Sequence, residues 1–178
     1  MRLFHFSDSP GIRRFVPRSP LTPSARPKGR EWLNGPLVWA VDEWHDFMYL
    51  FPRACPRILI WPTAQTSRQD KEIWFGGQSS RAIAFAEASW SARISAGVVH
   101  RYEMPLPLFQ NIDDAGMWVS TRAVVPETVE RIGDLPSQLG SRNIALRIVE
   151  RLTPLRNIWQ TSLHVSGIRL RNAEDWAR

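Results

Sequence analysis

Short runs of apolar residues, broken by proline, glycine and polar residues, divide the chain into segments of strand length. Residues 98–105 alternate apolar and polar positions, which indicates a strand with one buried face. Residues 56–62 are continuously apolar between two prolines and are typical of a central strand. The predicted strands cover 2–7, 36–41, 56–62, 98–105, two short segments within 116–135 around a turn near Pro126, and 143–150.

Three other segments have apolar residues at helical spacing. Residues 43–51 follow Asp42, a suitable N-cap, and place apolar side chains three and four positions apart. Residues 80–96 show the same spacing and end before Gly97, where a C-cap is expected. Residues 153–162 begin with a Thr–Pro pair that suits a helix start. We therefore expect helices in all three segments.

The order of these elements indicates an α+β fold. Strands are joined by loops too often for an alternating α/β pattern, so we expect a mixed, mostly antiparallel split sheet flanked by two to four helices. A length of 178 residues predicts one domain, over 1–178. Residues 16–36 are rich in proline, glycine and serine, and are interpreted as a mobile lid or as a loop pinned to the surface.

Composition limits the cellular location and the classes of binding partner that we expect. The chain has no apolar run long enough to span a membrane and no leader pattern, and it contains one cysteine, Cys55, so we expect a cytoplasmic protein without a membrane partner. The formal charge of +6, almost all from arginine, favours small anionic ligands, nucleotides or nucleic acid. Because the arginines are scattered, nucleic acid is the less favoured partner. The oligomeric state is not indicated.

The familiar sequence motifs of catalysis and cofactor binding do not occur. The chain has no glycine-rich phosphate loop, no paired-cysteine site, and no HExxH or GxSxG motif. Its four histidines show no spacing of metal ligands, so no metal site is predicted.

The first predicted strand carries two polar residues, His5 and Ser7, on one face. Such a donor–acceptor pair suits a carboxamide or a ribose hydroxyl. A similar pair, His164 and Ser166, occurs within residues 163–172, and we expect this segment beside the first strand, lining the same cleft. Two alternatives remain: a histidine whose ring bonds only the backbone, and a hydrolase that uses Ser7 or Ser166 as nucleophile.

Tyr49 and several arginines are further candidates for ligand binding. Tyr49 lies four residues after His45 on the predicted helix and suits stacking on a flat heterocycle, although it can equally form the rim of that helix's buried face. Phosphate groups could be held by arginines of two segments, namely Arg13, Arg14, Arg18, Arg169 and Arg171; the alternative is a solvated surface. Glu103, Asp113 and Asp114 are the candidate catalytic carboxylates.

Four longer segments resemble an uncharacterised bacterial family of unknown function. They are FHFSDSPGIRRFVPR, PLVWAVDEWHDFMYLFPRACPR, VVPETVERIGDLP and LHVSGIRLRNA, which together span most of the chain. This resemblance implies a shared fold and no activity.

The layout is also distantly similar to the ADP-ribosyltransferase-like superfamily. That resemblance implies a cleft in which His5, with Ser7, contacts the ribose and amide end of NAD and Tyr49 stacks on nicotinamide. In that superfamily a later strand ends in the motif V-P-x-x-V/I-x-x-I, which this chain matches with Val125, Pro126, Val129 and Ile132. The position of its catalytic Glu falls near Gly116 or Met117, which cannot supply a carboxylate.

The sequence thus predicts a nucleotide-binding protein of the NAD or ADP-ribose type, with NAD as the candidate cofactor. In this hypothesis Arg13 or Arg18 meets the pyrophosphate, and an ADP-ribosyltransferase-like activity follows if a carboxylate reaches the cleft. The alternative is a non-catalytic binding or interaction module that keeps the fold without the catalytic Glu.

Overall fold

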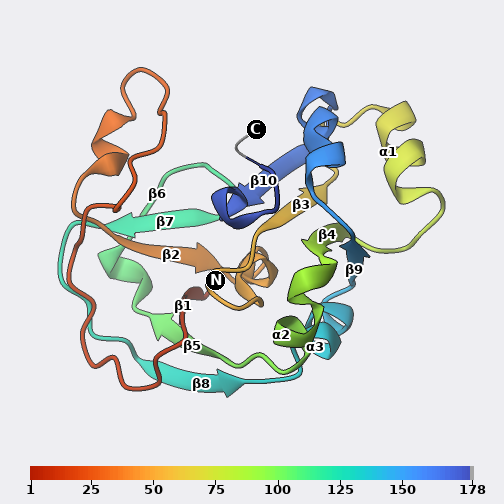
Figure 1. Cartoon of the computed structure of the whole chain (residues 1–178). Helices are drawn as coiled ribbons and strands as arrows, with labels where there is room; N and C mark the ends of the chain where they lie inside the picture. The colour runs from red at the N-terminus through yellow and green to blue at the C-terminus, as the bar shows by residue number, and fades with distance from the viewer. Residues whose placement is uncertain (177–178) are drawn as a thin grey trace. The chain divides into compact units, whose positions relative to one another are not determined.

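The structure is a computed structural model that describes residues 1–176, and two compact units can be distinguished in it. Unit 1 comprises Met1–Asp46 and Val99–Ile132, and unit 2 comprises Phe47–Val98 and Gly133–Arg178. Each unit has its own β-sheet, and the chain passes twice into each (Figure 1). The expectation of a single domain stays a prediction.

Unit 1 contains an antiparallel sheet of six strands in the order β6-β7-β2-β1-β5-β8. Two 3-10 helices, η1 (Glu31–Asn34) and η4 (Leu106–Leu108), lie in its connections. The strands are β1 (Leu3–Ser7), β2 (Val38–Asp42), β5 (Val99–Met104), β6 (Gln110–Asn111), β7 (Met117–Ser120) and β8 (Thr128–Ile132).

One face of this sheet packs against the loop that follows β1. The Tyr102 hydroxyl donates to the Ser9 main-chain oxygen at 2.5 Å and accepts the Ile12 N–H at 3.1 Å, which holds the loop over the sheet. Beyond it, Arg18 and Leu37 exchange two main-chain hydrogen bonds. The 16–36 connection is therefore pinned at its start and end. The buried cluster on this face comprises Leu3, Phe15, Val38, Ala40, Tyr102, Met104, Phe109 and Val124.

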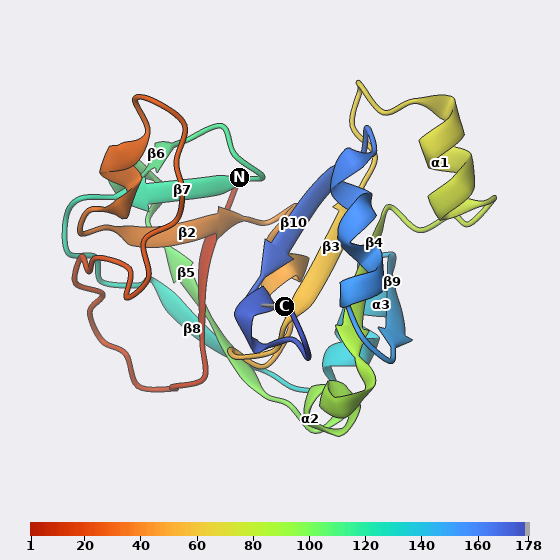
Figure 2. The same cartoon turned by 45° about the horizontal axis from the view of Figure 1, so that its top comes forward.

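Unit 2 contains a four-stranded sheet in the order β10-β3-β4-β9, whose strands lie side by side in Figures 1 and 2. Only β4 and β9 pair in parallel. The strands are β3 (Arg57–Trp61), β4 (Ala82–Glu87), β9 (Ile144–Val149) and β10 (His164–Ile168). The helices are α1 (Arg68–Phe75), α2 (Ser91–Ser95) and α3 (Leu135–Ser141), with 3-10 turns η3 (Ala88–Trp90), η5 (Thr153–Gln160) and η6 (Leu170–Asn172).

The main core of unit 2 lies on one face of this sheet. Ile58 and Ile60 of β3 meet Ile83 and Phe85 of β4 there, because alternate residues of a strand point to one face. Further buried members of this core are Phe75, Leu152, Ile158, Leu163 and Ala173. The other face carries Arg57, Leu59 and Trp61, with only alanines beside them on β4.

The predicted helix over 80–96 is wrong. Its first half is the buried strand β4, the 3-10 turn η3 follows, and an α-helix begins only at Ser91. All six residues of β4 are buried and the first five are apolar, with Glu87 at the end of the strand, so the strand lacks a period of two. Ile83 and Ala86 are three residues apart, which is also the spacing of apolar residues on one face of a helix.

The other predicted elements match the structure more closely. Each strand predicted with stated ends is confirmed within one or two residues at each end, and the two strands expected within 116–135 are β7 and β8. The segments 43–51 and 153–162 form 3-10 helices, η2 (Asp46–Tyr49) and η5, instead of α-helices. The α+β class with two mostly antiparallel sheets is confirmed. In the part of the chain that the structure describes, no helix is long and apolar enough to cross a membrane.

The expected neighbourhood of the two His-x-Ser strands is also wrong. β1 pairs with β2 and β5 in the sheet of unit 1, whereas β10 pairs with β3 in the sheet of unit 2. Two strands of similar sequence can each find partners elsewhere, because pairing depends on complementary registers and not on likeness.

Candidate functional site

Four arginines gather at one end of the β3–β10 pair in unit 2. Ile168, the last residue of β10, lies opposite Arg57, the first residue of β3, so the turn that follows β10 begins beside the start of β3. The Asn172 side chain donates to the Ala54 main-chain oxygen at 2.7 Å and joins this turn to the loop before β3. The cluster, called the arginine cluster below, consists of Arg53, Arg57, Arg169 and Arg171.

Arg57 is the buried member of the arginine cluster, with 2 % of its surface exposed. Its Nε and Nη1 donate to the main-chain oxygens of Met48 and Cys55, each at 2.8 Å. The guanidinium also lies over the rings of Phe51, at 5.0 Å, and Tyr49, at 5.8 Å. Burial, with a smaller contribution from the charge of Arg169, lowers the pKa of Arg57 to about 10. Arg57 therefore shapes the loop that holds Tyr49 and Arg53.

Arg169 has a left-handed backbone, with φ of 56°, directly before η6. This conformation is uncommon for a residue with a long side chain and costs about 1 kcal/mol. Burial lowers the pKa of Arg169, and the positive charges of Arg171 and Arg53 lower it further. The charged form of Arg169 is thus disfavoured by its own neighbours, an arrangement that occurs often at functional sites.

Within the described part of the chain, three members of the arginine cluster form no ion pair with a carboxylate. Among residues 1–176, neither Asp nor Glu forms an ion pair with Arg53, Arg57 or Arg169. Other arginines of the chain do pair with acids: Arg151, also in unit 2, contacts Glu174 at 3.2 Å and Asp175 at 2.6 Å. A bound anion can supply the missing negative charge, and guanidinium donors match the oxygens of phosphate.

Aromatic side chains accompany the arginine cluster along the same pair of strands. Tyr49 is half-buried on η2 beside Arg57. At the other end of β3, the Trp61 and His164 rings stack with centroids 4.1 Å apart and planes inclined by 19°, and Phe47 meets Trp61 edge-on. Unit 2 thus contains four of the predicted binding residues, Tyr49, His164, Arg169 and Arg171.

His5 and Ser7 lie in unit 1 and share one face of β1, as the spacing predicts. The His5 ring contacts Phe15, and its Nδ1 lies 2.8 Å from the Trp39 main-chain oxygen, so a ring nitrogen does bond the backbone. Ser7 is buried, and its hydroxyl accepts the Ser9 N–H at 3.1 Å. The contact of Ser7 stabilises the turn after β1. The place of His5 and Ser7 in a cleft shared with Tyr49 stays a prediction.

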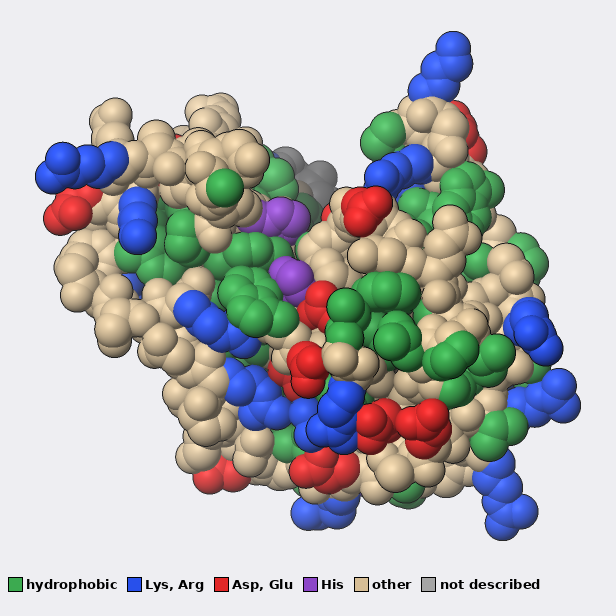
Figure 3. Space-filling view, turned by 180° about the vertical axis from the view of Figure 1, so that it is seen from behind, with side chains coloured by type: hydrophobic (Ala, Val, Ile, Leu, Met, Phe, Trp, Pro, Cys, Tyr) green, Lys and Arg blue, Asp and Glu red, His purple; other side chains and the backbone are tan. Residues whose placement is uncertain are grey.

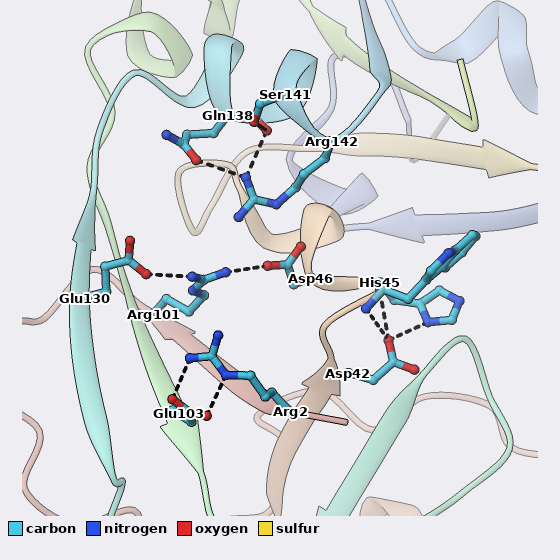
Figure 4. A network of polar contacts seen from close by, with 11 residues as sticks. Arg2, Asp42, His45, Asp46, Arg101, Glu103, Glu130, Gln138, Ser141 and Arg142 are labelled. Atoms are coloured by element: carbon cyan, nitrogen blue, oxygen red, sulfur yellow. Dashed lines mark hydrogen bonds and ion pairs between the residues drawn. The ribbon is translucent and has the colours of Figure 1, made fainter. Parts of the chain in front are cut away.

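The candidate carboxylates belong to unit 1, and Glu103 has a partner. The Arg2 side chain donates to both carboxylate oxygens of Glu103, at 2.7 and 2.6 Å (Figure 4). These hydrogen bonds hold the pKa of Glu103 below its ordinary value, so it remains ionised. Asp113 and Asp114 are exposed in the turn before β7. A catalytic role for any of the three stays a prediction.

The remaining predicted anion-binding residues, Arg13, Arg14 and Arg18, lie outside the arginine cluster. All three side chains are exposed in unit 1, where the main chain of Arg18 bridges to Leu37. Arg53 and Arg57 are not among the binding residues predicted from the sequence. Their only signal is the repeated Pro–Arg pair that flanks Cys55, with the second arginine opening a fully apolar strand.

On the face shown in Figure 3, several Lys and Arg side chains lie beside Asp or Glu. Within the described residues, no three His, Cys, Asp or Glu side chains are placed where they could hold a metal ion.

Comparison with known proteins gives a family and no activity. The model of a family of unknown function, DUF6886, matches residues 4–173. No curated protein and no solved structure matches the chain. The resemblance to an uncharacterised family is thereby confirmed.

Proposed function

The chain belongs to the family of unknown function DUF6886, and because membership brings no activity, we propose from the geometry of unit 2 that the protein binds a nucleotide. The phosphate groups lie on Arg53 and Arg169, and the base lies against Tyr49. The observation that carries this proposal lies in the arginine cluster: two main-chain hydrogen bonds hold the buried Arg57 guanidinium, and among residues 1–176 neither Arg57 nor the half-buried Arg169 forms an ion pair with a carboxylate.

Electrostatics favours a phosphate over a neutral ligand. Burial and repulsion from neighbouring arginines destabilise the charged forms of Arg57 and Arg169. A bound anion offsets this repulsion because its negative charge attracts the guanidinium groups. A hydrogen bond to a charged group contributes about 1.5–3 kcal/mol, and paired N–H donors of arginine fit two phosphate oxygens at once. A pyrophosphate, with two neighbouring negative charges, matches a site built from several arginines better than a single carboxylate does.

The aromatic groups favour a phosphate ester of a flat base. Tyr49 lies beside Arg57, so a ligand that contacts the exposed arginines also reaches the edge of this ring. His164, stacked on Trp61, lies about 13 Å farther along the strand pair, the length of four strand residues. Together with the distant similarity to the ADP-ribosyltransferase-like superfamily, this arrangement supports ADP-ribose or NAD as the class of ligand.

We expect calorimetry with ADP-ribose to detect this binding. The substitution Arg169→Asn keeps a residue that tolerates the left-handed backbone and removes the guanidinium, so the affinity falls at least about tenfold. Arg68→Asn, at an exposed position of α1, is the matched control and leaves the affinity unchanged. Adenosine, which lacks phosphate, binds more weakly than ADP-ribose. Equal affinity of the wild-type protein and Arg169→Asn, or no binding at all, contradicts the proposal.

A second measurement separates an NAD-consuming transferase from a non-catalytic module. The residues near the position of the superfamily's catalytic Glu are Gly116 and Met117, which supports the module. Incubation with NAD followed by chromatography then shows no release of nicotinamide, although NAD binds. Release of nicotinamide that is lost in Arg169→Asn supports the transferase instead.

A further inference from the structure

Two neighbouring pockets in unit 1, called the Trp32 pockets below, have Trp32 and Gln110 in common. Their volumes are about 240 and 250 Å³. The polar residues in their walls include Arg30, Asn111 and Asp113 in the first pocket, and Thr121 and Arg122 in the second. Both are smaller than the pockets of about 300 Å³ or more that hold drug-sized ligands, so each suits a single ring with its substituents.

Trp32 is exposed although the turn that carries it is fixed to the sheet. Its neighbour Leu33 is buried with Ile112 and Val119, and the Arg30 Nη1 donates to the Ile112 main-chain oxygen at 2.9 Å. The Trp32 residue itself is 45 % exposed. Among residues 1–176, its ring meets no other aromatic or cationic group, and its indole N–H has no acceptor. Trp32 therefore presents a flat apolar surface that a ligand can cover at little cost in side-chain ordering.

The edge strand β6 adds main-chain groups to the first pocket. Among the described strands, β6 pairs only with β7. The Ile112 N–H donates to the Met117 oxygen at 3.2 Å, so the preceding residue, Asn111, occupies a non-hydrogen-bonded position of this antiparallel pair. The main-chain N–H and C=O of Asn111 therefore point out from the edge of the sheet, where Asn111 lines the first pocket.

Gln110 supplies an amide to both pockets. It lies opposite Val119, so its side chain is on the face of the sheet where Leu33 and Val119 are buried together. Gln110 is exposed, and within the described residues its amide forms no hydrogen bond. The Thr121 hydroxyl, in the second pocket, is likewise exposed and without a partner there. The Trp32 pockets thus offer donors and acceptors that the described protein does not use.

We propose that the Trp32 pockets bind a neutral oligosaccharide, with one pyranose unit packed on the Trp32 ring and the adjoining unit in the second pocket. A pyranose has a face of C–H groups, which suits an aromatic ring, and a rim of hydroxyls that donate and accept. The Gln110 amide and the Asn111 main chain each combine a donor with an acceptor, as neighbouring hydroxyls require. The two pockets, with Gln110 in both, match two linked sugar units.

The charges and the short edge strand argue against other ligands. The Arg30 guanidinium already bonds a main-chain oxygen, and the other two charged side chains of the pocket walls, Asp113 and Arg122, have opposite signs. The Trp32 pockets therefore attract phosphate less than the arginine cluster does, with which they share no residue. A peptide added as a strand would gain little, because β6 has only two residues.

Proton–nitrogen NMR of the wild-type protein tests the site without any variant. The chain has nine tryptophans, and the indole signal of Trp32 is assigned through its contacts in the wild-type protein. On titration with cellotetraose, maltotetraose and chitotetraose, the Trp32 signal shifts with at least one of the three, with a dissociation constant of about 1 mM or lower. A Trp32 signal that none of the three tetrasaccharides shifts overturns the proposal.

Calorimetry with the tetrasaccharide that binds then measures the contribution of each group. Trp32→Ala lowers the affinity at least about tenfold, and Gln110→Leu, which keeps the size of the side chain, lowers it about threefold to tenfold. Trp44→Ala is the matched control, because Trp44 is 46 % exposed in the same unit and lines neither pocket, and it changes the affinity less than about twofold. Equal affinity of the wild-type protein and Trp32→Ala, or an equal loss in both tryptophan variants, overturns the proposal.

Discussion

The Nε of Arg57 lies 2.8 Å from the main-chain oxygen of Met48, in a place where almost none of the arginine is exposed. A second bond, to Cys55, closes residues 48–57 into a loop around one guanidinium. Carbonyl oxygens and aromatic rings surround this charge, so the loop is stabilised from within. The same loop carries Tyr49 and Arg53, which links the stability of unit 2 to the proposed binding site.

Replacing Arg57 should therefore destabilise the protein. Arg57→Met leaves two main-chain oxygens without their donor, and we expect the free energy of unfolding to fall by about 2–4 kcal/mol. Urea unfolding followed by tryptophan fluorescence measures this loss, with Arg68→Met as the control at an exposed helix position. A loss below about 0.5 kcal/mol would show that the loop does not depend on Arg57.

Replacing Arg169 should have the opposite effect on stability. Arg169→Asn relieves a left-handed arginine and removes a charge that burial and two neighbouring arginines disfavour. We expect the thermal midpoint, measured without ligand, to rise by about 2–4 °C. A midpoint that falls would mean that the Arg169 side chain contributes packing that outweighs its electrostatic cost.

The sequence predicted the strands well because most of them have clear ends. Prolines bound β3 on both sides, and the alternation in β5 reflects one buried face. It failed at β4, because this strand is buried on both faces and pairs in parallel with β9, about 60 residues away. Local spacing contains no information about a neighbour at that distance.

The candidate site was predictable only in part, for the same reason. Tyr49, His164 and Arg169 were chosen by residue type, and the structure places all three in unit 2. The arginine cluster joins Arg53 to Arg169 through the register of β3 with β10, which the sequence does not show. The sequence instead suggested that the two His-x-Ser strands pair, and likeness between strands is no guide to pairing.

Two glycines allow a matched test of the turn against His45. Gly116→Ala forces a methyl group into the imidazole and a side chain into a positive φ, so we expect a loss of about 2–4 kcal/mol in the free energy of unfolding. Gly140→Ala, where a Cβ meets nothing within 4 Å, should be neutral or stabilise α3 by up to about 1 kcal/mol. Chemical denaturation of both variants measures the difference. Equal stabilities would mean that the turn moves away from His45 at little cost.

The Arg2–Glu103 pair should make stability depend on acid pH. Hydrogen bonds from Arg2 lower the pKa of Glu103, so the stability they contribute is present above the ordinary pKa of about 4.3 and is lost as the pH falls through the lower folded value. Because 53 % of the Arg2 side chain is exposed, Arg2→Gln should cost no more than about 1 kcal/mol at neutral pH. Urea unfolding at a series of pH values should show this difference disappearing in acid. A difference that persists would assign the effect to the contact of Arg2 with the Phe4 ring.

Cys55 should be an inert thiol as long as its loop is closed. Burial raises the pKa of Cys55 to about 11, against the opposing charges of Arg57 and Arg93. The thiolate fraction then falls about a hundredfold, and we expect labelling by a disulfide reagent near neutral pH to be slowed at least that much relative to the denatured chain. Rapid labelling of the native protein would show that the loop opens readily.

A crystal structure of the protein with ADP-ribose tests the central claim most directly. The account predicts density for the pyrophosphate within about 3 Å of the Arg53 or Arg169 guanidinium, with the adenine or the ribose against Tyr49. Density for the pyrophosphate away from the arginine cluster, or an empty cluster at saturating ADP-ribose, would contradict it.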